Sequence, residues 1–150
     1  MDTHHGEIGT LGAAETLKLL ELGSIGHLGC SKNEEVYVVP ITYAFDDGYL
    51  YSHAKPGKKI EMMRKNPRIC IQVEEVQNLF QWKSAIAWGR FEELKGDRAA
   101  RAMRLLIKKI GDKQGKGPGS PLEFDIEALL ETAVIFAMKI EKTTGRSEGG

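Results

Sequence analysis

Four polar residues in one short stretch of the sequence have the types and spacing that suit an anion. Ser52 and His53 end an apolar, strand-like segment, and Lys58 and Lys59 follow after a short loop. Proline is favoured at the first position of a helix, so Pro56 predicts a helix start there, with unpaired backbone N–H groups in its first turn. Unpaired N–H groups, a helix dipole and two ammonium groups together favour the binding of a phosphate.

A plainer interpretation of the same residues stays open. Lys58 and Lys59 could form the solvated side of a short helix whose apolar residues, Ile60 and Met63, pack inward, because most runs of charge are solvated. His53 could be a hydrogen-bonded residue at the end of a strand and take no part in proton transfer. The stretch alone does not decide between a phosphate site and a surface helix.

A hairpin is expected to position Ser52 and His53. Residues 36–45 alternate as a strand, and an Asp-Gly pair supplies a two-residue turn of the kind that fixes hairpin register. That register pairs Tyr43 with Ser52 and Thr42 with His53. The pattern therefore predicts Thr42 and His53 on one face and Tyr43 and Ser52 on the other, level with the helix start.

The remaining pattern predicts a mainly β protein with flanking helices. Six strands are expected, joined by hairpins or short helices, which favours an antiparallel barrel over a doubly wound sheet. Pro40 cannot donate to a strand ladder, so it should mark an edge or a bulge. The expected strands are 24–31, 36–45, 49–53, 69–73, 80–93 and 134–141, and the expected helices are 13–22, 56–65, 97–110 and 120–131.

Composition limits the class of protein. A length of 150 residues suits one domain, residues 1–150, with segments 1–10, 111–119 and 143–150 expected to be flexible. The 21 basic and 21 acidic residues balance, which disfavours nucleic acid as a partner. Cys30 and Cys70 lie far apart outside any motif, which argues against a disulfide framework or a metal site and favours two reduced core residues. No apolar run suits a membrane span or a signal peptide, so a cytoplasmic location is expected.

Motifs for chemistry by the protein alone are absent from the sequence. It has no zinc-protease, nucleophile-elbow or Walker motif, so an enzyme of this sequence would depend on a bound cofactor. The segment from Ser84 to Ala87 is made of small residues with one isoleucine, which would let a flat ligand or a second subunit approach the strand, although ordinary strand packing would also explain it. Together with the anion site, this segment suggests a phosphorylated planar cofactor.

Four segments in this order resemble one family. They are Val38–Tyr43, Tyr49–Ile60, Asn66–Cys70 and Trp82–Leu94, within a similarity that extends from Leu17 to Leu94 and, more loosely, to the final strand. The sequence is similar to the FMN-binding split barrels related to pyridoxamine 5′-phosphate oxidase, and closest to the nitroimidazole-reductase-like branch.

The resemblance implies a six-stranded split β-barrel that forms a homodimer and binds flavin mononucleotide (FMN) at the subunit interface. Ser84 matches a position that faces the flavin and is often glutamine in the family. The other implied contacts are Ser52 and His53 beside the phosphate and the flavin, Lys58 and Lys59 on the phosphate, and Pro40, Ile41, Thr42 and Tyr43 along the isoalloxazine ring.

The implied function is an oxidoreductase that passes electrons or hydride from a reduced donor, such as a reduced nicotinamide, to a small-molecule acceptor. His53 is the candidate catalytic residue, because an imidazole near the ring could supply or steer a proton. The alternative is a flavin- or haem-type carrier without turnover. Pyridoxamine 5′-phosphate oxidase activity itself is not expected, because the C-terminal third lacks the arginine-rich substrate contacts.

Overall fold

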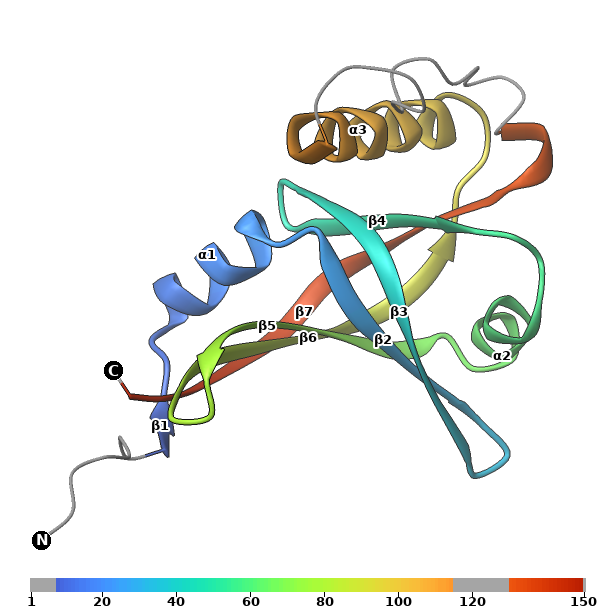
Figure 1. Cartoon of the computed structure of the whole chain (residues 1–150). Coiled ribbons are helices and arrows are strands. Elements are labelled where there is room, and N and C mark those ends of the chain that lie inside the picture. Colours follow the sequence, from blue (N-terminus) through green and yellow to red (C-terminus); the bar gives the residue numbers. More distant parts are fainter. Residues whose placement is uncertain (1–7, 115–129, 150) are drawn as a thin grey trace, which may run out of the picture.

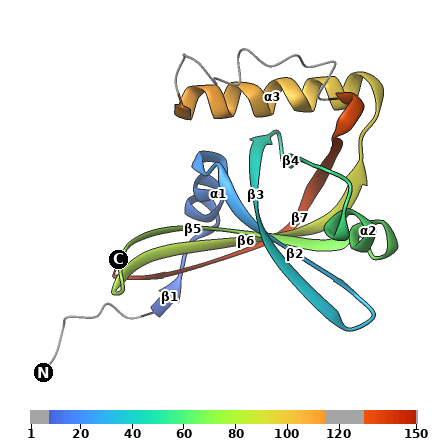
Figure 2. The same ribbon diagram turned by 45° about the vertical axis from the view of Figure 1, so that its right-hand side comes forward.

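The computed structural model describes residues 8–114 and 130–149, which form a mostly antiparallel β structure with helices around it (Figures 1 and 2). Seven strands follow the order β1-β7-β4-β3-β2-β5-β6, and β6 also pairs with β7, so that β2 to β7 close into a ring and β1 extends it at β7. The elements are β1 (Ile8–Thr10), α1 (Ala13–Leu22), β2 (Ile25–Lys32), β3 (Glu35–Asp46), β4 (Tyr49–Ala54), α2 (Lys58–Lys65), β5 (Arg68–Asn78), β6 (Gln81–Glu93), α3 (Gly96–Gln114) and β7 (Val134–Glu148).

The seams of this ring differ in length. β6 and β7 pair over most of their length, whereas β2 and β5 share three residue pairs, centred on Leu28 and Ile71, and β3 and β4 share four. The first half of β3, including Pro40, pairs with β2 alone among the described residues. The hairpin of β2 and β3 therefore projects beyond the ring (Figure 1), which gives the open, split form of a β-barrel and confirms the predicted fold class.

Two apolar cores hold the fold together. The first fills the ring, where period-two alternation turns residues such as Leu28, Ile71 and Phe136 inward. The second lies between the outer face of β4 and β7 and the helix α3, which crosses above them (Figure 2). The buried stripe of α3 that helical spacing predicts is confirmed: Ala99, Ala102, Met103, Leu106 and Ile107 are buried.

The helix predicted over residues 13–22, with Ala13, Leu17 and Leu20 at helical spacing, is confirmed as α1, but its buried face is partly different. Leu17 is 40% exposed, whereas Thr16 and Leu20 are buried. The end of α1 is fixed from inside the ring, because the Tyr43 hydroxyl donates a hydrogen bond of 2.6 Å to the Leu20 carbonyl. Burial raises the pKa of Tyr43, so the phenol remains a donor at physiological pH.

The number of strands is seven and not six, because the sequence pattern did not reveal β1. β1 lies inside segment 1–10, which was expected to be flexible, and pairs Ile8 with Glu148 and Thr10 with Arg146. Segment 143–150 was also expected to be a flexible polar tail, but β7 continues through it to Glu148 and pairs with β6. Residues 1–7 and 150 lie outside the described residues.

Two predicted helices have different boundaries in the structure. α2 begins at Lys58 and not at Pro56, and α3 continues to Gln114, so the predicted loop 111–119 starts with a turn of helix. The rest of that loop and residues 120–129 of the last predicted helix lie outside the described residues, and residues 130–132 are helical. Across the described residues, no helix combines the length and apolarity needed to cross a membrane.

Candidate functional site

The predicted hairpin register is confirmed from Tyr43–Ser52 to Asp46–Tyr49, and the predicted pair Thr42–His53 lies just beyond the end of this ladder. Tyr43 pairs with Ser52, and the turn residues Asp47 and Gly48 both have positive φ, 47° and 81°, as a two-residue hairpin turn of this type requires. Tyr43 and Ser52 are turned into the ring and buried, each at most 1% exposed. The Ser52 hydroxyl donates a 2.6 Å hydrogen bond to the carbonyl of Thr42, so it ties the two strands together at this level.

The four predicted residues of β3 alternate between two environments. Ile41 and Tyr43 are buried in the first core, whereas Pro40 is exposed and Thr42 is half-buried on the outer face. A ligand on the outer face could therefore meet side chains of Pro40 and Thr42, but only backbone atoms of Ile41 and Tyr43. His53 is half-buried one residue beyond Ser52, on the face opposite to it, where it pairs with Ile135 of β7.

The start of α2 leaves its first-turn N–H groups without a side-chain cap. Its N-cap residue is Gly57, which has extended backbone geometry and no side-chain acceptor, and the first helical bond runs from the Glu61 N–H to the Gly57 carbonyl. The N–H groups before Glu61 thus have no partner within the helix. An anion bound here would accept hydrogen bonds from these N–H groups, which is the phosphate site that the sequence predicts.

The two lysines at the start of α2 have different surroundings. The Lys58 ammonium is exposed and contacts Glu35 at the beginning of β3, with 2.5 Å between Nζ and Oε2, and lies 5.1 Å from the ring centre of Tyr37. The hydrogen bond that Lys58 donates to Glu35 raises the pKa of Lys58. In this structure Lys58 is therefore already engaged by a carboxylate from the projecting hairpin.

Lys59 is half-buried, and its charge affects two neighbouring groups, His53 and Cys30. Burial is the larger cause that lowers the pKa of His53, and the charge of Lys59 lowers it further. The same charge opposes the effect of burial on the pKa of Cys30. His53 is thus a neutral imidazole at physiological pH, and Lys59 is the basic group near it.

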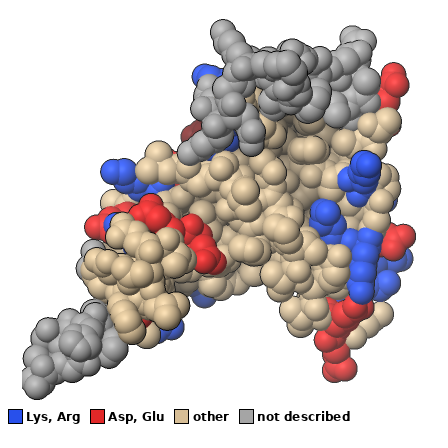
Figure 3. All heavy atoms as spheres, in the orientation of Figure 1, with Lys and Arg blue, Asp and Glu red and all other residues tan. Residues whose placement is uncertain are grey.

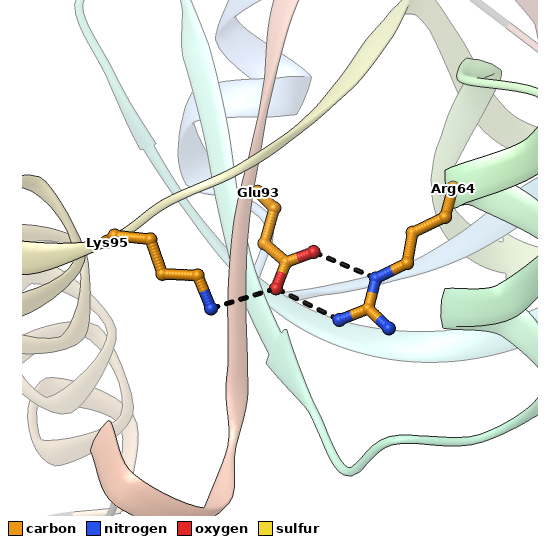
Figure 4. Close-up of polar contacts among 3 residues, drawn as sticks. All are labelled: Arg64, Glu93 and Lys95. Atoms are coloured by element: carbon orange, nitrogen blue, oxygen red, sulfur yellow. Dashed lines mark hydrogen bonds and ion pairs between the residues drawn. The ribbon is translucent and has the colours of Figure 1, made fainter.

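The other end of α2 is anchored to β6. Arg64 donates two hydrogen bonds to Glu93, of 2.9 and 3.0 Å, and the Lys95 ammonium lies 3.1 Å from the same carboxylate (Figure 4). The bonds from Arg64 are the main cause that lowers the pKa of Glu93. This contact fixes the orientation of α2 and hence the place of its basic first turn.

An apolar groove of about 330 Å³ lies on the outer face, by the C-terminal end of α2. Ser31, on its lining, accepts a hydrogen bond of 3.2 Å from Asn66 at the end of α2. A Cβ at Gly29 would lie 2.9 Å from the Cys70 sulfur, so glycine is what allows the thiol to lie over β2. The lining residues come from β2, β3, β5 and β6: Gly29, Cys30, Ser31, Val36, Val38, Arg68, Ile69, Cys70 and Trp88.

Cys70 differs from the prediction that both cysteines are core residues. Cys30 is buried, but Cys70 is half-buried and lines the groove, and burial raises the pKa of its thiol. Cys70 pairs with Gly29, on the outer face, whereas Cys30 turns into the ring. The two thiols therefore lie on opposite faces of β2 and β5.

Ser84 stands apart from the other predicted site residues. It is half-buried on the outer face of β6, and β2 and β5 lie between it and Thr42 on β3, a separation of roughly 14 Å at normal strand spacing. Its hydroxyl accepts a 3.0 Å hydrogen bond from the amide of Gln72 on β5. The structure thus holds Thr42, Ser52 and His53 close together where β3 meets β4, with the Ser52 side chain inside the ring, and leaves Ser84 three strands away from Thr42.

Sequence reasoning missed three residues that contact the predicted ones. Glu35 and Tyr37 contact Lys58, and Gln72 contacts Ser84. Gln72 left a signal, because it is a polar residue in the outward position between Ile71 and Val73. Glu35 left none, since its contact depends on how far the hairpin reaches toward α2.

Known proteins resemble this chain in sequence and in structure. A model of the pyridoxamine 5′-phosphate oxidase family matches residues 12–147. An uncharacterized protein of Rhizobium meliloti (strain 1021) is 31% identical over 129 residues, which are 83% of this chain and 85% of that protein. The crystal structure of an FAD-binding protein from Mesorhizobium loti has a TM-score of 0.76 and 34% identity, and the match covers 97% of this chain and 99% of that one.

A more distant structure shares the fold alone. A proposed 5-nitroimidazole antibiotic resistance protein from Bacteroides thetaiotaomicron has a TM-score of 0.71 at 19% identity, and the match covers 99% of this chain and 96% of that one. The family model spans both the hairpin with its basic helix and the closing strand β7. This split-barrel chain therefore belongs to the pyridoxamine 5′-phosphate oxidase family.

Proposed function

We propose that this protein binds FMN and passes electrons or hydride from a reduced donor, such as a reduced nicotinamide, to a small-molecule acceptor. The observation that carries the proposal is the basic, uncapped first turn of α2, whose Lys58 contacts Glu35, the neighbour of Val36 in the lining of the apolar groove. An apolar groove suits a flat ring, and a basic helix start suits a phosphate. Membership of a family whose FAD-binding relative from Mesorhizobium loti is 34% identical supports a flavin as the ligand.

The residues present fit the phosphate of such a cofactor. The N–H groups before Glu61 have no partner within α2, and Lys59 adds a positive charge beside them. Lys58 would add a second charge by exchanging Glu35 for the phosphate. Pro40 and Thr42 offer outer-face side chains to the ring, and Ser52 holds the two strands that carry them.

His53 is proposed to manage a proton next to the flavin. Bound FMN would supply the hydride and electron-transfer chemistry. Burial and Lys59 lower the pKa of His53, which keeps the imidazole neutral, with one nitrogen able to donate and the other able to accept. The role of His53 is to hold or deliver that proton, while the half-buried surroundings limit access of water.

FAD is a second candidate, favoured by the relative from Mesorhizobium loti that binds it. FAD carries the same riboflavin 5′-phosphate unit, so the basic helix start would hold either cofactor. A non-catalytic flavin carrier is the alternative to an enzyme, with the same site and no turnover.

The outer face that carries the groove is proposed to form a homodimer with the flavin at the interface. Ile25, Val36 and Val38 are 64%, 74% and 62% exposed on this face, which is unusual for large aliphatic side chains. In Figure 3 an area without charged side chains fills the centre of the view, over β2 and β3, and Lys and Arg side chains gather on its right. A second copy would cover these aliphatic residues.

The dimer is tested by placing a charge in this face. Val38→Asp is expected to convert a dimer into a monomer in sedimentation velocity, because a buried, unpaired carboxylate opposes association. Leu22→Asp, at an equally exposed position on α1, is the matched control and should leave the dimer intact. A Val38→Asp protein that sediments as the wild type does, or a wild type that is monomeric, would contradict the proposed interface.

The cofactor is tested on the purified protein. We expect a yellow preparation, or uptake of added FMN, with flavin absorption bands and one flavin released per chain on denaturation; the mass of the released flavin distinguishes FMN from FAD. Bleaching by a reduced nicotinamide under nitrogen, followed by recovery with an acceptor, would indicate an enzyme and not a carrier. A colourless protein that takes up neither FMN nor FAD would refute the proposal.

A further inference from the structure

Three polar side chains from three neighbouring strands are joined in a row on the outer face. His27 on β2 pairs in register with Gln72 on β5, and their side chains meet with 3.2 Å between Nδ1 and Oε1. The amide nitrogen of Gln72 donates to the Ser84 hydroxyl on β6 at 3.0 Å. His27 pairs with exposed Pro40 on β3, and Gln72 pairs with half-buried Ile86 on β6. The amide of Gln72 therefore lies between apolar residues of the two flanking strands.

A neighbouring carboxylate fixes the orientation of this amide. Gln72 Nε2 also donates to Glu74 Oε1 at 3.2 Å. A carboxylate can only accept, so the nitrogen of the amide must face Glu74 and Ser84, and the oxygen must face His27. His27 therefore carries a proton on Nδ1, and Gln72 holds one orientation and not the flipped one.

The row ends in hydrogen-bonding capacity that the protein does not use. Ser84 accepts from Gln72, which leaves its own hydroxyl hydrogen to donate, and the second ring nitrogen of His27, Nε2, is also left over. No partner for either group occurs in the described part of the chain. One lone pair of the Gln72 carbonyl is open as well. A ligand edge with both a donor and an acceptor would complete the row.

A groove adjoins these groups. It has a volume of about 390 Å³, and its lining is mixed: Gln72, Glu74, Asn78, Lys83 and Ser84 are polar, and Val76, Leu79 and Trp82 are apolar. Small-molecule sites combine apolar surface with polar groups that converge on the ligand, and this groove offers both. The groove and the unused hydrogen-bonding groups are separate observations, and both indicate a ligand at Gln72.

We propose that Gln72 is a flavin-binding residue whose amide contacts the polar edge of the ring, and that His27 and Ser84 are positioning residues that hold this amide. The inference rests on the proposed function and deepens it. A serine side chain extends one heavy atom beyond Cβ, whereas the amide of Gln72 extends further from a neighbouring strand. Gln72, and not Ser84, is then the main polar contact on this side of the site.

The test compares flavin binding by Gln72→Leu with that of Ser84→Ala and of a matched control, Gln77→Leu, which makes the same change at an exposed position of β5 outside the row. Titration by quenching of FMN fluorescence should show affinity lowered roughly 3- to 10-fold for Gln72→Leu, as expected for loss of one hydrogen bond to a ligand. Ser84→Ala should lose less, and Gln77→Leu should bind as the wild type does. Thermal unfolding without flavin checks that each variant is folded.

A second readout separates contact with the ring from a merely structural role. Gln72→Leu should shift the visible absorption maximum and the midpoint potential of the bound flavin, which a distant structural change would leave unmoved. A folded Gln72→Leu protein with wild-type affinity, spectrum and potential overturns the inference, and so does a larger loss in Ser84→Ala than in Gln72→Leu. If the wild type binds flavin and Lys59→Ala weakens that binding, such a result refutes only the role of Gln72; a wild type that binds no flavin refutes the proposed function as well.

Discussion

Replacing Lys59 with alanine is expected to weaken FMN binding by roughly 10- to 150-fold, the effect of losing a charge-assisted phosphate contact. Lys59 is the half-buried lysine of the first turn of α2, and its charge already lowers the pKa of His53. A phosphate at the uncapped helix start would meet this charge with limited screening by water. Quenching of FMN fluorescence on titration with the protein measures the change.

Two other lysines of α2 make this experiment specific. Lys58→Ala should lose affinity at the lower end of the same range, because Lys58 must give up Glu35 before it can bind a phosphate. Lys65→Ala makes the same substitution in the last turn of α2 and should leave the affinity unchanged. Wild-type affinity in both the Lys58 and the Lys59 variants would mean that the start of α2 does not hold the phosphate.

Gly89→Ala is expected to have the largest effect on stability, with a loss of about 3 kcal/mol in the free energy of unfolding. A Cβ at Gly89 would lie 2.1 Å from the Lys139 carbonyl oxygen and 2.7 Å from Met138 Cγ. The register of β6 and β7 shifts just before Gly89, so the backbone of β7 approaches closely at this point. That backbone cannot retreat without breaking the ladder that closes the ring.

Thermal unfolding followed by circular dichroism measures the loss, which should lower the melting temperature by roughly 6 to 12 °C for a domain of this size. Gly9→Ala is the control, because a Cβ at Gly9 would meet nothing within 4 Å. Equal melting temperatures for Gly89→Ala and the wild type would contradict the close approach of β7 to β6.

The parts of the fold that local signals determine could be predicted from the sequence. The Asp-Gly turn fixed the register that pairs Tyr43 with Ser52, and helical spacing with a following glycine fixed the bounds of α1. β1 could not be predicted, because three residues carry no periodicity and are held only by pairing with a strand far along the chain. The polar end of β7 likewise has no local strand signal and is held by β6.

The candidate site divides in the same way. Thr42, Ser52 and His53 could be brought together from the sequence, because one hairpin carries them. The contact between His27 and Gln72 could not, since it depends on the pairing of β2 with β5, which no turn connects. Which face of β3 a residue occupies was also undetermined for Pro40 to Tyr43, because both faces of that strand are largely apolar in sequence.

The projecting hairpin bears on how readily this protein aggregates. From Glu35 to Thr42, β3 has β2 on one side and no strand on the other among the described residues, so it presents an open edge. An open edge is a template for unwanted pairing between chains and for aggregation. Pro40 removes one donor from that edge, and Glu35 places a charge at its start, and both are devices by which natural sheets block such pairing. The hairpin can thus extend outside the barrel without becoming a seed for fibrils.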